Sequence, residues 1–164
     1  MTTRPLASPT AADQQRLALL IEAESIQLKE FIAVLEREEA LLVAGDTDAL
    51  LNLTQQKTER YRQLQRLHAD RMLLIGRLGF AQLNEAVQVI CAGLPRVLAR
   101  WNEVLDLARQ ARDRNALNGK LIVERMANNQ AALSILLAAS DQPQLYDAHG
   151  HSRPTGGGRI LGSA

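Results

Sequence analysis

The stretch over residues 109–137 restricts the possible folds of this chain more than any other, because it lacks proline and consists mostly of strong helix formers. Residues three and four apart form one stripe along it, which predicts a single long helix. Counted from Trp101, this stripe contains Leu105, Ala108, Arg112, Asn115, Gly119, Ile122, Met126, Asn129, Leu133 and Leu136. Its ends are apolar, but its middle is polar and includes a glycine, which costs about 1 kcal/mol inside a helix relative to alanine.

The polar middle of the stripe has two interpretations. Buried asparagines can fix the register of a coiled coil, at a cost in stability. Alternatively, the stripe forms a shallow, part-polar groove with bare backbone at Gly119, on which a helix from another protein lies. The pattern alone leaves both interpretations open.

The composition favours helices packed on helices. Hydrophobic residues make up 46 % of the 164 residues, but aromatic residues only 3 %, so the core consists of aliphatic side chains, which suit helices better than strands. The length fits one domain. We therefore predict an all-α fold with a leader over 1–10, a helical bundle over 11–140 and a flexible tail over 141–164.

Periodicity and capping residues predict four helices, over 11–44, 47–78, 84–91 and 95–139. Gly45 is suited to end the first helix and Asp46 to cap the second, so a short joint makes these two long helices antiparallel neighbours. The first helix has a clear apolar stripe, composed of Leu17, Ile21, Leu28, Phe31, Leu35 and Leu42. Glu24 and Glu38 interrupt its other seam, which predicts a one-sided stripe, and Lys57 is expected to extend its ammonium group into water.

Several classes of function find no support in the sequence. The net charge is +1 without a basic block, which argues against nucleic-acid binding. The lone Cys91 is expected in the core, and it fits a reducing compartment. Neither a secretory signal nor an 18-residue apolar run is present, which predicts a cytoplasmic protein without stable membrane insertion. Asp147, His149 and His151 are too close together, and without a further ligand nearby, to predict a metal site.

An enzyme is the weaker alternative. Glu24, Lys57, Arg71 and Arg112 could converge in a bundle core and bind a small dianion, in the manner of chorismate mutases. Nothing in their spacing requires this arrangement. We therefore predict no catalytic residues and no cofactor.

Three stretches resemble the FlgN family of flagellar export chaperones, and with the helix pattern the resemblance covers about residues 11–150. The first is AGDTDALLNLTQQK (44–57), at the joint between the first two helices. The second comprises NALNG (115–119), the Leu121–Ile122 pair and NQAAL (129–133), and the third is LYDAHG (145–150). Asp147 departs from the family pattern, in which a glycine is common after the tyrosine.

The resemblance implies a small cytoplasmic helical bundle that binds the hook–filament junction proteins FlgK and FlgL before their secretion. It also implies delivery of these clients to the export-gate protein FlhA, with Leu145 and Tyr146 as the gate contact. The implied client-binding groove on the last helix consists of Arg112, Asn115, Asn118, Gly119, Ile122, Met126, Asn129 and Leu133. The alternative is a self-associating coiled-coil scaffold, and the sequence leaves open whether the chain forms a homo-oligomer.

Overall fold

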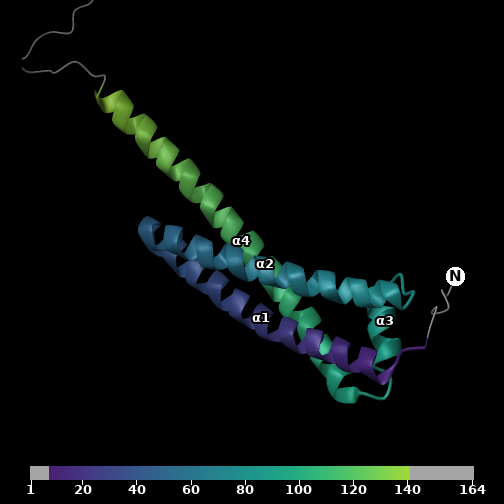
Figure 1. Ribbon diagram of the computed structural model, residues 1–164. Coiled ribbons are helices and arrows are strands. Elements are labelled where there is room, and N and C mark those ends of the chain that lie inside the picture. Colours follow the sequence, from purple (N-terminus) through teal and green to yellow (C-terminus); the bar gives the residue numbers. More distant parts are fainter. Residues whose placement is uncertain (1–7, 141–164) are drawn as a thin grey trace, which may run out of the picture. The chain divides into compact units, whose positions relative to one another are not determined.

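The computed structural model describes residues 8–140, which form four helices (Figure 1). These are α1 (Ala11–Ala44), α2 (Thr47–Arg77), α3 (Leu83–Ile90) and α4 (Pro95–Ser140). No strand occurs among these residues. The predicted all-α fold is confirmed, and every helix begins and ends within one residue of its predicted bounds.

The first two helices form the predicted antiparallel hairpin (Figure 1). Gly45 ends α1 in the left-handed conformation with φ 74°, a region that glycine enters without steric cost. The Asp46 carboxylate accepts a hydrogen bond from the Ala49 amide at 3.0 Å and so caps α2. The joint is therefore built from the two residues that the sequence indicates.

The N-terminal part of α4 runs parallel to α1. Arg100 pairs with Glu22 at 2.7 Å, and further along both helices Arg114 pairs with Glu36 at 3.1 Å. Since residue numbers rise together on the two helices, α4 is parallel to α1 and antiparallel to α2. Helix α1 is thus the common neighbour of the other two long helices.

The core lies between the helices of the N-terminal part of the chain and is mostly aliphatic. Trp101 is the largest fully buried side chain, and its indole Nε1 donates a hydrogen bond to Asn84 Oδ1 at 2.9 Å. Cys91 is buried, as predicted, in the same core. The core also contains Leu17, Ile21, Leu28, Phe31, Ile32, Leu35, Leu74, Ile75, Leu78, Phe80, Ala86, Val87, Ile90, Val104 and Ala111.

Two predictions about polar residues on the first helices are wrong. Glu24 and Glu38 are buried, each only 6 % exposed, so α1 packs on both sides and its stripe is not one-sided. Lys57 forms an ion pair with Glu38 at 2.9 Å instead of extending freely into water. Each buried carboxylate pairs with a cation of α2, Glu24 with Arg71 and Glu38 with Lys57. This pairing offsets part of the cost of removing the carboxylate charge from water.

The chain divides into two units, Met1–Ile122 and Val123–Ala164, and α4 contributes residues to both. Between residues 8 and 140 no helix is both long and apolar enough to cross a membrane. The predicted tail over 141–164, with Leu145, Tyr146 and the rejected Asp147, His149 and His151 cluster, lies outside the described residues, as does most of the predicted leader. The predicted domain boundaries therefore stay predictions.

Candidate functional site

The C-terminal part of α4 exposes large apolar side chains. Met126 is 65 % exposed and Leu136 66 %. Contiguous exposed apolar surface in a small protein marks a place where another molecule binds. Within residues 123–139 the large exposed apolar residues are Val123, Met126, Leu133, Ile135, Leu136 and Leu137.

Most of the residues predicted to line a client groove are exposed. In the first unit these are Arg112, Asn115, Gly119 and Ile122, the last of which is 39 % exposed. In the second unit they are Met126, Asn129 and Leu133. A Cβ atom added at Gly119 would meet no atom within 4 Å. The packing of the chain itself therefore gives no reason for a glycine there.

Asn118 differs from the other predicted groove residues, because it is completely buried. Its amide nitrogen donates to the Leu35 carbonyl oxygen at 2.9 Å and to Glu38 Oε1 at 2.8 Å, both on α1. Glu38 also accepts from Lys57, so three helices meet at one carboxylate. Asn118 thus fixes α4 against α1, as a register-setting asparagine would, and is not accessible to a client in this structure.

The buried face of α4 is one position away from the stripe that the sequence predicts. The buried residues Val104, Ala111 and Asn118 are seven apart, whereas the predicted stripe contains Leu105, Arg112 and Gly119. One position corresponds to about 100° of rotation around a helix. A repeat every seven residues in the sequence could have indicated this buried face. It does not read as an apolar repeat, because two of its three positions are an alanine and an asparagine.

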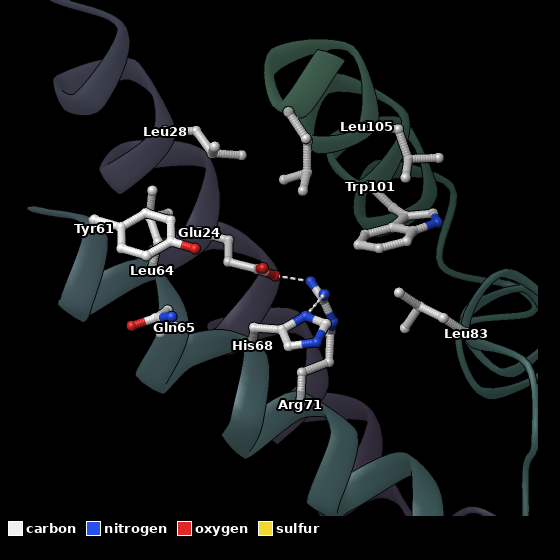
Figure 2. Close-up of a pocket in the computed structure, with 12 residues that line it drawn as sticks. Glu24, Leu28, Tyr61, Leu64, Gln65, His68, Arg71, Leu83, Trp101 and Leu105 are labelled. Atoms are coloured by element: carbon white, nitrogen blue, oxygen red, sulfur yellow. Dashed lines mark hydrogen bonds and ion pairs between the residues drawn. The ribbon is translucent and has the colours of Figure 1, made fainter. Parts of the chain in front are cut away.

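A hollow of about 590 Å³ opens between α2 and α4, with α1 at its base (Figure 2). Glu24 and Arg71 form a buried ion pair in its wall, and His68 Nδ1 lies 2.9 Å from the Arg71 guanidinium. The guanidinium also lies over the Trp101 ring, 4.9 Å from its centroid, where a cation is attracted to the π system. The remaining lining is largely apolar, with Leu28, Leu64, Leu83, Val104 and Leu105.

Burial controls the electrostatics of this ion pair. It raises the pKa of the Glu24 carboxyl group above its ordinary value, and the positive charge of Arg71 opposes that rise. Burial raises the pKa of the Cys91 thiol as well. A thiol of this kind is a poor nucleophile, because the reactive form is the thiolate.

The four residues of the enzyme alternative do not converge on one centre. Glu24 and Arg71 line the hollow just described, whereas Lys57 and Arg112 line a neighbouring hollow of about 480 Å³. Glu24 and Lys57 are engaged in ion pairs with Arg71 and Glu38. Among residues 8–140, no cluster of three or more His, Cys, Asp or Glu side chains could hold a metal ion.

Comparison with known proteins gives consistent matches along most of the chain. A family described as FlgN protein matches residues 13–154. A flagella synthesis protein FlgN of Yersinia enterocolitica serotype O:8, biotype 1B, is 26 % identical over 150 residues, which cover 90 % of this chain and 95 % of the relative. A second Yersinia enterocolitica protein of that name is 27 % identical over 82 % of this chain and 86 % of its own length. The Proteus mirabilis protein is 25 % identical, covering 85 % and 91 %. No solved structure matches.

Proposed function

Because this chain belongs to the FlgN family and so has a role in flagellum synthesis, we propose that it is a cytoplasmic export chaperone. In this proposal it binds the C-terminal helices of the hook–filament junction proteins FlgK and FlgL and prevents their premature assembly. It then delivers them to the flagellar type III export gate. The family is not a known enzyme family, and the proposal includes no catalytic residue, cofactor or metal.

The exposed apolar side chains of α4 are the observation that supports client binding. Ile122, Met126, Leu133 and Leu136 follow one another at intervals of four, seven and three residues, which is the spacing of anchors between paired helices. A flexible methionine and the small Ala127, Ala131 and Ala132 let one surface adapt to two related clients. A client helix bound to this surface would have its apolar face covered by α4, and so could not use that face for assembly.

Delivery is proposed to use Leu145 and Tyr146 as the contact with the gate protein FlhA. This part of the proposal depends on the sequence resemblance at 145–150, which lies outside the described residues. It separates two tasks along the chain, with client binding on α4 and gate contact after it.

The decisive experiment is calorimetry of the purified full chain with the C-terminal helical segment of FlgK, and then of FlgL. We expect 1:1 binding that Met126→Asp weakens tenfold or more, because burying a methionine side chain is worth about 1.5–3 kcal/mol. Asn128→Asp is the matched control, since it places the same residue on the opposite side of the helix. Equal loss in both variants, or no binding by the folded wild-type chain, would refute the proposal.

The alternative is a self-associating coiled-coil scaffold, in which the same exposed residues of α4 pair with a second copy. Light scattering of the wild-type chain and of Ile122→Asp distinguishes the two functions. A scaffold would lose its oligomeric state on this substitution. A chaperone would keep its state and its helical content but lose its client.

A further inference from the structure

A second elongated surface lies in the first unit. The two hollows between α2 and α4 meet at Tyr61, which lines both and is 53 % exposed. Together they follow residues 57–71 of α2 and 101–115 of α4. At 1.5 Å per residue each wall is about 21 Å long, or about four helical turns. We call this surface the α2–α4 groove.

The floor and walls of this groove are mainly apolar. Leu28 and Phe31 of α1 form the floor, and the Phe31 ring lies 6.3 Å from that of Tyr61. Leu64 on one wall and Leu105 on the other are only partly buried. The groove can therefore remove further apolar surface from water when a molecule of matching shape lies in it.

The arrangement of the long helices indicates that this molecule is a helix. In a four-helix bundle each helix has two close neighbours, and the fourth helix lies opposite the first. Here α1 is the neighbour of both α2 and α4 and forms the floor of the groove between them (Figure 2). A helix in the groove would occupy the fourth position of such a bundle.

The charges that line the groove specify the character of that helix. Lys57, Arg71 and Arg112 are the cations that line the groove. Lys57 pairs with the buried Glu38 and Arg71 with the buried Glu24, so Arg112 is the groove cation without a buried partner. Arg112 is paired only across an exposed contact with Asp113, at 3.3 Å. Acidic side chains beside the apolar stripe of an incoming helix would complement Arg112.

We propose that the α2–α4 groove is a second binding site, which takes an amphipathic helix of about four turns with carboxylates bordering its apolar stripe. The site is formed by the first unit alone. It is independent of the client contact proposed for the C-terminal part of α4, so either proposal can fail without the other.

The test uses Trp101, the single tryptophan of the chain, which lies in the groove wall. The probe is an 18-residue synthetic helix with leucines three and four apart, glutamates beside them and a dansyl group as energy acceptor. A matched probe has lysines in place of the glutamates. We expect the acidic probe to quench Trp101 emission by energy transfer, with an affinity that falls as salt is added. The lysine probe should bind at least tenfold more weakly.

Four variants locate the binding. Ala108→Glu inserts a large carboxylate into the groove wall and should abolish quenching by the acidic probe, whereas Ala99→Glu, an exposed change elsewhere on α4, should not. Arg112→Glu should weaken the acidic probe and strengthen the lysine probe, a gain that a misfolded variant could not produce. Met126→Asp should change neither.

Several results would overturn this proposal. Equal binding of both probes would remove the charge argument, and insensitivity to Ala108→Glu would place the probe elsewhere. Loss of quenching in Met126→Asp would assign the probe to the C-terminal part of α4. If light scattering shows a dimer that Ala108→Glu converts to a monomer, the groove is occupied by a second copy of the chain and not by an acidic helix.

Discussion

Gly119 lowers the stability of α4, and the packing of the chain does not explain why a glycine is present there. Replacing it with alanine should raise the free energy of unfolding by roughly 0.5–1 kcal/mol, because alanine is the better helix former and open space surrounds the new methyl group. If a client helix lies against this bare backbone, the same methyl group should weaken binding of the FlgK segment. Urea unfolding and calorimetry measure the two effects separately.

Gly76 provides the matched control for that experiment. It also lies in a helix with open space where a Cβ atom would be, but on α2. Gly76→Ala should therefore stabilise the chain without changing affinity for the client. Unchanged affinity in Gly119→Ala would show that the client does not approach the backbone at this point.

The buried pair of Glu24 and Arg71 makes a prediction about pH. A carboxyl group whose pKa is higher in the folded than in the unfolded chain binds its proton more tightly when folded. Stability is then lost as pH rises from the ordinary value of 4.5 through the raised pKa of Glu24. Arg71→Met removes the cation that opposes this rise. The deficit of this variant relative to wild type should grow from pH 5 to pH 8, reaching about 3–5 kcal/mol.

A double substitution separates the pair from its parts. Glu24→Leu combined with Arg71→Met leaves no buried charge unpaired, so its stability should lie within about 1–2 kcal/mol of wild type and lose the added pH dependence. Urea unfolding at both pH values gives the comparison. A double variant as unstable as Arg71→Met would mean that packing, and not the buried charge, dominates.

At the scale of single residues, burial of polar side chains was the least predictable property. Glu38 interrupts a helix seam in the sequence and Asn118 is predicted in the client groove, and only their contact across 80 positions shows that each partners the other. Local patterns carry no information about such long-range pairs. For this reason the sequence predicts Asn118 in the client-binding groove, together with residues that are exposed in the structure.

Among the elements, the helices themselves were well predicted because their signals are local. Gly45, Asp46 and Pro95 mark ends that need no tertiary contact to be recognised. The face that each helix buries is a different matter. For α1 a leucine and isoleucine repeat defines this face, whereas for α4 the buried face includes Ala111 and Asn118, which do not mark it as apolar in the sequence.

The two parts of α4 should differ in their hydrogen exchange. Helices owe most of their stability to tertiary packing, and every described side chain from Val123 to Ala139 is exposed. We expect amides of residues 123–139 to exchange faster than those of 97–118 in the free chain. Addition of the FlgK segment should slow exchange more in residues 123–139 than in residues 97–118, as measured by mass spectrometry. Equal protection of both regions in the free chain would count against this difference.

At the scale of the whole molecule, client binding and export should be separable. Tyr146→Ala should leave the affinity for the FlgK segment unchanged, because the proposed client residues are on α4, and should reduce secretion of FlgK and motility. Tyr146→Phe, which keeps the ring, is the control for the loss of apolar contact. A parallel fall in client affinity would show that the two tasks share residues.

The exposure of the C-terminal part of α4 has a consequence for how such chains diverge. Beyond Ile122 the described side chains are exposed, so substitutions there alter no buried contact within residues 8–122. Mutations in that part can accumulate in step with changes in a partner's helix, while descendants inherit the same folded bundle. Lineages with different partners can therefore arise from one ancestral fold without passing through unstable intermediates.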